Sequence, residues 1–353
     1  MKVLYACDFH LKQSSSGKDR ATRQKLEALS LIVDDFKVLS ANMRSKPLRF
    51  MEIFLIEALV LAYLIFWRPS IFISRGHVGF LSVGFAKVLN VKTVREVHAD
   101  TLGELKLLRF HGVKRMVVHG LAIVADWTNK KSDVRIYNHP DLLTWYRSNG
   151  VGSESDFFTY NGFDVRSRSS LSKERAREKF GLSQDAVYLV FTGGASEWHG
   201  VDYLLSLQKK FNEYGDNIKI VVGGGDISRY EGSENCINIT PLEESGCADL
   251  IRAADVCLLP VKANRISPGS PLKLYDYIVN ERFIAAQSNT LGYSDEVERH
   301  RVGFSVDFAD PEVAREQIIK FLDSMRAEYR GVNIRASWAD RMQEWLIGLR
   351  FDV

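Results

Sequence analysis

The 353-residue chain has the length of about two domains, and its 46% hydrophobic and 26% charged residues are typical of a globular enzyme, not of a disordered or low-complexity protein. A net charge of +3 gives no reason to expect a nucleic-acid partner. The charge is uneven, because residues 1–165 contain 23 Lys and Arg against 16 Asp and Glu. A basic first half suits an anionic ligand or a membrane surface, and ordinary solvated charge would give the same count.

The cysteines and the apolar segments favour a cytoplasmic protein. Cys7, Cys236, Cys247 and Cys257 form no CxxC pair, so we expect reduced thiols and no zinc site. Met1 is followed directly by strand-like residues, without the pattern of a signal peptide. The most apolar segment, residues 53–67, contains a glutamate and is shorter than the ~20 residues that span a bilayer. We predict that it forms a buried core helix.

Strand and helix patterns alternate along the first half of the chain. The predicted elements are a strand at 1–7, a helix at 19–39, a helix at 51–67, a strand at 70–74, a helix at 78–89 and a strand at 92–98. The pattern weakens between Asn129 and Asn161. Repeated units of this length predict a parallel sheet covered by helices on both faces.

The alternation resumes after a polar segment at 167–172. The predicted elements are strands at 186–191, 218–222, 256–261 and 283–286 and helices at 201–211, 248–254, 271–280, 313–329 and 337–349. The fold class is therefore α/β, with two doubly wound, Rossmann-like domains at residues 1–165 and 166–332 and a C-terminal segment at 333–353.

Three segments of the second domain follow predicted strands, where sheets of this type bind ligands. Glycines occupy the first two, Phe191–Gly200 and Gly223–Asp226, and let a ligand approach the backbone closely. Gly-Gly turns are also common without a ligand, and His199 could donate to a phosphate or cap the next helix. The second segment lacks the GxGxxG spacing of a dinucleotide site, which argues against a dehydrogenase.

The third segment, residues 265–277, predicts an anion site at the start of a helix. Ser270 is a suitable N-cap and Pro271 a suitable first helical residue, so free N–H groups and the positive end of the helix dipole would face a phosphate. Lys273 adds a charge, and Asp276 lies one turn later, where a ribose could bind. An ordinary capped helix with a solvated Lys–Asp pair is the alternative.

At these residues the chain resembles the retaining GT-B glycosyltransferases of the family 4 type, in which two Rossmann-like domains face a central cleft. Five segments resemble family motifs in the right order: residues 161–164 (NGVD), 191–205 (GxxxxxKGxDxLI), 253–260 (ADVxxxP), 270–277 (SPxKLxEY) and 337–338 with the closing helix, which crosses back to the first domain. The resemblance covers nearly the whole chain.

The resemblance implies a donor site. Asp276 takes the place of the ribose-binding glutamate, and Lys273 meets the diphosphate. His98, from an ExH-like segment, would face the donor sugar, and Arg75 would face the cleft as a further catalytic residue. The other nucleotide-sugar-binding residues that the resemblance implies are Gly17, Gly193, Gly194, His199, Gly224, Arg265, Ser267, Gly269, Ser270, Pro271 and Leu272.

Two positions depart from the family pattern. Gly194 and His199 occupy the places of a basic pair, so His199, Lys273, Arg265 or helix ends must meet the phosphate charge. Pro268 stands where the first acidic residue of the paired-glutamate motif is usual. These departures leave open a weakened or altered activity.

We therefore expect transfer of a sugar from a UDP- or GDP-sugar to a glycan or lipid-linked acceptor with retention, as in bacterial surface polysaccharide synthesis. No metal, cofactor or nucleic-acid partner is expected. The basic and apolar stretches at 41–50 and 105–116 suggest peripheral contact with an anionic membrane, or helices with one solvated face. An epimerase of the same architecture and a nucleotide-sugar-binding module with weakened catalysis are the alternatives.

Overall fold

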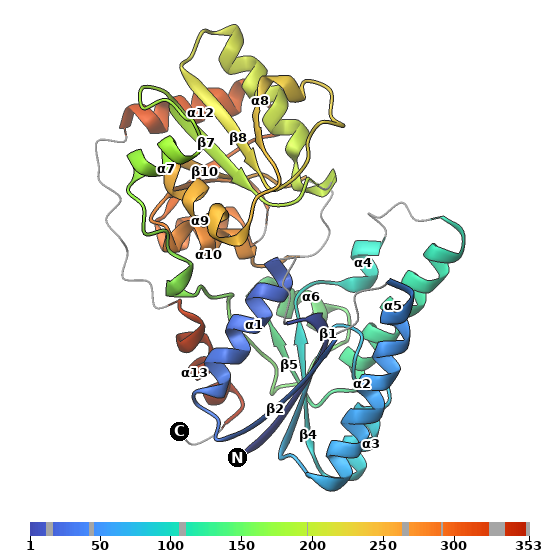
Figure 1. Cartoon of the computed structure of the whole chain (residues 1–353). Helices are drawn as coiled ribbons and strands as arrows, with labels where there is room; N and C mark the ends of the chain where they lie inside the picture. The colour runs from blue at the N-terminus through green and yellow to red at the C-terminus, as the bar shows by residue number, and fades with distance from the viewer. Residues whose placement is uncertain are drawn as a thin grey trace. The chain divides into compact units, whose positions relative to one another are not determined.

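The computed structural model describes residues 1–11, 17–41, 46–105, 111–195, 197–262, 268–290, 292–324 and 336–350. Contacts divide the chain into two compact units. The first contains Met1–Gly162, Ile266–Gly269 and Ala336–Val353, and the second contains Phe163–Arg265 and Ser270–Arg335. Each unit has its own parallel sheet with helices around it (Figure 1). The prediction of two doubly wound α/β sheets is confirmed.

The sheet of the first unit has, among the described residues, six parallel strands in the order β2-β1-β3-β4-β5-β6. The strands are β1 (Lys2–His10), β2 (Asp35–Ala41), β3 (Ile71–Arg75), β4 (Lys92–Val97), β5 (Val134–Tyr137) and β6 (Phe157–Phe158). The helices are α1 (Gly17–Ser30), α2 (Lys46–Phe66), α3 (Ser82–Val88), α4 (Thr101–Leu105), α5 (Gly112–Lys131), α6 (Pro140–Ser148) and α13 (Trp338–Gly348). The strand order reverses between β1 and β3, and ligands bind such sheets at the carboxyl ends of the strands beside the reversal.

Strand β2 corrects the prediction of one long helix at 19–39. Helix α1 ends at Ser30, and β2 begins at Asp35 as an edge strand parallel to β1, with Phe36 opposite Val3. Apolar residues continue at helical spacing through this segment, so the pattern hid the break. Edge strands are only half covered, and β2 accordingly lacks the buried run that marks its neighbours.

Helix α2 is a core helix on one face only, so the prediction of a buried helix was half wrong. Ile56, Val60 and Leu64 join the core between α2 and the sheet. The opposite face is apolar too, yet it is exposed. The carboxylate of Glu57 is buried and accepts hydrogen bonds from the backbone N–H groups of Gly79, Leu81 (3.3 Å) and Ser82 (3.0 Å), which caps the start of α3.

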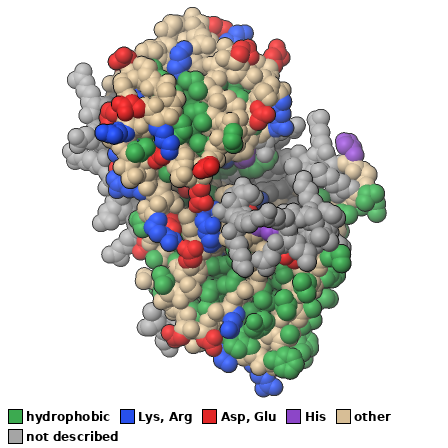
Figure 2. Space-filling model, in the orientation of Figure 1, with side chains coloured by type: hydrophobic (Ala, Val, Ile, Leu, Met, Phe, Trp, Pro, Cys, Tyr) green, Lys and Arg blue, Asp and Glu red, His purple; other side chains and the backbone are tan. Residues whose placement is uncertain are grey.

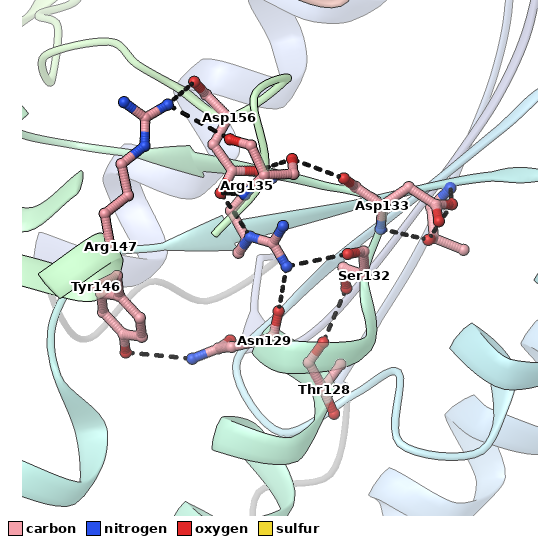
Figure 3. Close-up of polar contacts among 10 residues, drawn as sticks. Thr128, Asn129, Ser132, Asp133, Arg135, Tyr146, Arg147 and Asp156 are labelled. Carbon is pink, nitrogen blue, oxygen red and sulfur yellow. Dashed lines mark hydrogen bonds and ion pairs between the residues drawn. The ribbon is translucent and has the colours of Figure 1, made fainter. Parts of the chain in front are cut away.

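A polar network orders the segment in which the sequence pattern weakened. Arg135 is 3% exposed, and its Nε lies 2.7 Å from Oδ2 of Asp156. Its Nη1 donates to the backbone oxygens of Asn129 (2.9 Å) and Ser132 (3.0 Å), which joins β5 to the end of α5 (Figure 3). The charged Arg135 interrupts the apolar pattern of β5, whereas α6 buries Leu142 and Tyr146 on one face and was missed although its pattern was available.

The C-terminal helix α13 belongs to the first unit. Ser337 and Asp340 form a capping box at its start. The indole Nε1 of Trp338 donates to Oε1 of Gln24 on α1 (3.3 Å), and Nε of Arg341 donates to the backbone oxygen of Asn161 (3.1 Å). None of the helices in the described ranges combines the length and the apolar run that a bilayer crossing requires.

The described sheet of the second unit also has six parallel strands, in the order β12-β11-β10-β7-β8-β9. The strands are β7 (Val187–Thr192), β8 (Ile218–Gly223), β9 (Ile237–Ile239), β10 (Val256–Leu259), β11 (Phe283–Gln287) and β12 (Gly303–Val306). The helices are α7 (Lys173–Lys179), α8 (Val201–Glu213), α9 (Glu244–Ala253), α10 (Leu272–Val279), α11 (Ser294–His300) and α12 (Pro311–Ser324). Here the order reverses between β7 and β10, which places the ligand-binding end of this sheet beside Thr192 and Leu259.

We predict that Glu57→Ala lowers the free energy of unfolding by about 1–3 kcal/mol, because two buried backbone N–H groups, of Gly79 and Ser82, lose their acceptor. Glu57→Gln keeps one oxygen and should lose less. Urea denaturation would measure both. Glu213→Ala, at an exposed ion pair with Lys210, is the control and should change stability far less. Equal losses at the two positions would contradict the capping role.

Candidate functional site

The carboxylate of Glu96, at the end of β4, is the centre of a buried charged cluster in the first unit. Its Oε1 contacts Lys25 Nζ, His98 Nε2 and, at 3.1 Å, Arg75 Nη1. The hydroxyl of Tyr5 donates to Oε2 (2.7 Å). One carboxylate thus holds together side chains from α1, β1, β3 and the residue after β4.

Arg75 is a buried member of this cluster. It is 6% exposed, its Nη1 donates to Oγ1 of Thr22 (2.8 Å), and its guanidinium lies 4.8 Å from the ring centre of Phe9. In this structure the Arg75 side chain contacts Glu96, Thr22 and Phe9 inside the first unit. Its contact with a donor remains a prediction.

The cluster keeps its central carboxylate ionised. Burial alone would raise the pKa of Glu96, but the charges of Arg75 and Lys25 and the hydrogen bond from His98 hold it well below its usual range. Burial lowers the pKa of Lys25 to about 7, although the Glu96 carboxylate opposes the shift. Arg75 also balances the negative charge of Glu96. Lys25 can therefore lose its proton while Glu96 stays ionised.

His98 is neutral at physiological pH. Burial and the nearby charge of Arg75 lower its pKa to about 4, against the opposing effect of Glu96. Its Nε2 faces the ionised Glu96 and therefore carries the proton as donor, whereas Nδ1 accepts from Nδ2 of Asn138 (3.3 Å). The pair fixes both the tautomer and the plane of the ring.

A small cavity adjoins this cluster within the first unit. Lys25, Glu96, His98, Asn138 and Trp345 are among its lining residues, and its volume is about 10 Å³. That is about the space of one water molecule. The cavity has room for a single water or hydroxyl between the charged cluster and the indole ring of Trp345.

Lys273 and Gly193 meet at the strand-order reversal of the second unit. Gly193 follows β7 with φ +134°, and a Cβ there would overlap Cε of Lys273 and lie 3.1 Å from its Nζ. The ammonium group lies 5.1 Å from the ring centre of Phe191. The positive φ favours glycine at 193, and a larger residue would also displace the flexible end of the lysine side chain. The structure brings together two residues that were predicted from separate motifs.

Tyr277 fixes the helix that carries Lys273. Its hydroxyl accepts from the backbone N–H of Thr192 (3.1 Å) and donates to the backbone oxygen of Leu258 (3.2 Å), so it bridges β7 and β10. Residues four apart lie on one face of a helix. The bridge therefore directs Lys273, one turn earlier, toward the same strand ends. Asp276 is half-buried, and its backbone oxygen accepts from Asn280 Nδ2 (2.9 Å).

Gly194, Gly224 and His199 lie near the same strand ends. A Cβ on Gly194 would lie 4.0 Å from Cε1 of His199, whose ring packs on Trp198 at 3.8 Å between centres. Gly224 has φ +88°. A Cβ on Gly225 would lie 2.7 Å from the backbone nitrogen of Ala195. Close packing of the loops after β7 and β8 explains this second glycine segment without a ligand.

The predicted N-cap role of Ser270 was wrong. Helix α10 begins at Leu272, its N-cap is Pro271, and that residue offers no side-chain cap. The Ser270 hydroxyl instead lies 3.1 Å from Oε2 of Glu296, which also accepts from Tyr275 (2.9 Å). The buried carboxylate on α11 competes for the hydroxyl and anchors the loop before α10.

Of the remaining predicted residues, the structure describes Gly17 and Gly269. Gly17 is the first residue of α1, and open space surrounds the position of a Cβ there. Gly269 is buried. Arg265 and Ser267 lie outside the described residues, as do residues 106–110 of the basic and apolar stretch at 105–116.

Sequence reasoning missed Lys25 and Asn138 and gave Glu96 no role of its own. One signal was available, because Arg95 and Glu96 are adjacent charges in a strand that reads as fully buried. Such residues need partners inside the protein. The sequence does not say that Lys25, 71 residues earlier, is the partner.

No protein-family model matches the sequence, and no curated protein matches it. Solved structures do match. Sucrose-phosphate synthase from Thermosynechococcus elongatus has 13% identity and a TM-score of 0.67 over 99% of this chain and 97% of its own. WaaG, a glycosyltransferase involved in lipopolysaccharide biosynthesis, has 14% identity and a TM-score of 0.65 over 99% and 96%. HepE of Anabaena, in complex with UDP-glucose, has 14% identity and a TM-score of 0.61 over 100% and 96%. These likenesses establish the GT-B fold for both units.

We predict that stability falls as the pH drops from about 6.5 toward 4, because the unfolded chain protonates His98 in this interval and the folded chain does not. One proton corresponds to a slope of about 1.4 kcal/mol per pH unit. Urea denaturation between about pH 5.0 and 6.5 should show a slope shallower by most of this amount in His98→Gln. His119→Gln, at an exposed position, controls for the loss of an imidazole. Identical slopes in wild type and His98→Gln would refute a neutral His98 in the folded chain.

Proposed function

We propose that the protein is a glycosyltransferase that moves a sugar from a UDP- or GDP-sugar to a glycan or lipid-linked acceptor with retention of configuration. The observation that carries the proposal is Lys273 lying across Gly193 at the strand-order reversal of the second unit. A cation and an open glycine backbone at that position suit a diphosphate. The UDP-glucose named with HepE, which has the same fold, supports this donor class.

The proposed chemistry is stabilisation of the departing nucleoside diphosphate. Lys273 supplies a charge, and the N–H groups at the start of α10 supply aligned dipoles, so no metal ion or other cofactor is proposed. Asp276, one turn further, is the proposed partner of the ribose hydroxyls. Tyr277 supports the step by holding α10 against the strand ends before the donor binds.

His98 is the proposed contact to the donor sugar, as the family resemblance implies. Glu96 and Asn138 orient its neutral ring, and Arg75 and Lys25 hold Glu96 ionised. A neutral ring suits a sugar hydroxyl, because it offers hydrogen bonding without a charge that would need a counterion. Lys25 and Glu96 are positioning residues in this arrangement.

One departure from the family pattern favours a second candidate. Pro268 stands in place of an acidic residue, which would suit a nucleotide-sugar-binding module with weakened catalysis. Donor hydrolysis or transfer would exclude that candidate. Product analysis without an acceptor would separate transfer from an epimerase of the same architecture.

The proposed setting is bacterial surface polysaccharide synthesis, in the cytoplasm or on the cytoplasmic face of the membrane. The basic first half of the sequence supports peripheral contact with anionic lipid.

We predict that a matching UDP- or GDP-sugar raises the melting temperature, since a ligand at 100 times its Kd adds about 2.7 kcal/mol. Lys273→Met should weaken binding about tenfold or more, because the diphosphate loses a charged partner. Thermal shift with UDP-, GDP- and ADP-sugars is the measurement. Lys210→Met, which removes a lysine from the exposed Glu213 pair, should leave the shift unchanged. A shift that survives Lys273→Met in full would rule out the proposed diphosphate seat.

We predict that His98→Ala lowers turnover about tenfold or more while nucleotide binding stays nearly intact, because the second unit holds the nucleotide. Steady-state kinetics and donor titration of the same variant would show the difference. His119→Ala is the exposed control. Wild-type turnover in His98→Ala would remove this residue from the site.

A further inference from the structure

Helix α2 has the reverse of the polarity expected for a surface helix. Its two acidic side chains, Glu52 and Glu57, are 4% and 1% exposed. Its outward face is apolar and is formed by Met51, Phe54, Leu55, Leu59, Ile65 and Phe66, of which the last is 86% exposed. A helix that is apolar all round is normally covered on every side. This one is covered on one side only.

Helix α5 adds a second exposed apolar stripe. Val113, Met116, Val117, Ile123 and Trp127 recur at the spacing of one helix face, and all are exposed. Exposed basic residues accompany the stripe, with Arg115 in the first turn and Lys130 and Lys131 in the last.

The two helices belong to one layer of the first unit. α2 packs on α3, and α3 packs on α5. Phe54 on α2 makes an edge contact with Phe80, just before α3, at 5.6 Å between ring centres. Figure 2 shows exposed hydrophobic side chains gathered over this part of the molecule. We call the outward residues of α2 and α5 the apolar helical face.

The charge around the apolar helical face identifies its occupant. Residues 42–131 contain 14 Lys and Arg but six Asp and Glu, and three of the acidic and two of the basic residues are buried, so the basic excess remains. A twofold pair of such faces would bring like charges together, which disfavours a second copy of the chain. A bilayer with anionic lipid offers both an apolar interior for the exposed side chains and negative charge for the basic ones.

We propose that the apolar helical face docks on the surface of a bilayer that contains anionic phospholipid. The helices lie in the interface and do not cross it, in keeping with the absence of a spanning helix among the described residues. This inference deepens the membrane contact in the proposed function and rests on it for the choice of partner. It does not depend on the chemistry of sugar transfer.

Sedimentation with sucrose-loaded vesicles tests the proposal. The full chain should bind vesicles of 70% phosphatidylcholine and 30% phosphatidylglycerol, bind pure phosphatidylcholine more weakly, and be released in part by 0.5 M salt. The double variant Leu55→Gln/Met116→Gln leaves the net charge unchanged and should bind about tenfold more weakly. Ile347→Gln replaces an equally exposed apolar residue on α13 and should bind like wild type.

Three outcomes would overturn the proposal: no binding to anionic vesicles, equal loss in Ile347→Gln and the double variant, or a wild-type dimer in light scattering that the double variant abolishes. A thermal shift with a donor sugar checks that the variants are folded. It also separates the two ideas, since a wild-type chain that binds lipid but no sugar nucleotide would refute the proposed function alone.

Discussion

The buried carboxylate of Glu96 is the contact on which the organisation of the first unit's site depends. Its oxygens accept from side chains of α1, β1, β3 and the segment after β4, so elements far apart in the sequence converge on one charge. An unpaired charge in such a place is strongly unfavourable, and a partly satisfied network would be worse than an apolar one. Each partner therefore constrains the position of the others, and His98 acquires its orientation from groups that need not touch a substrate.

The second unit prepares its strand ends with a tyrosine hydroxyl and a glycine. The hydroxyl of Tyr277 bridges two strand ends, and Gly193, with its positive φ, lies beside the end of the Lys273 side chain. The two units share a parallel sheet architecture, but different interactions prepare their strand ends. Lys273 lies near the ring of Phe191 and the backbone of Gly193 at the strand ends, whereas the charged contacts of the first unit compensate one another.

Sequence reasoning succeeded where a feature is local. Strand β10 is a continuous apolar run and β3 begins with one. The glycines predicted after a third such run do follow a buried strand, β7. It failed where a distant residue decides the outcome. Ser270 has the side chain of an N-cap, but Glu296, 26 residues later, takes its hydroxyl. Helical spacing of apolar residues continued from α1 into β2 because an edge strand needs no fully buried face. In β5 the charged Arg135, paired with Asp156, interrupts the apolar pattern.

The position of Glu57 has a consequence for how α2 selects its orientation. A helix with apolar side chains on every side could turn about its own axis and still cover the sheet with similar residues, since each position advances by about 100°. Burial alone would leave several rotational settings of comparable energy. The carboxylate can reach the amides before α3 in one setting only. The hydrogen bonds of Glu57 therefore determine which apolar residues face outward. Polar residues can replace those outward ones without loss of the hydrogen bonds that orient the helix.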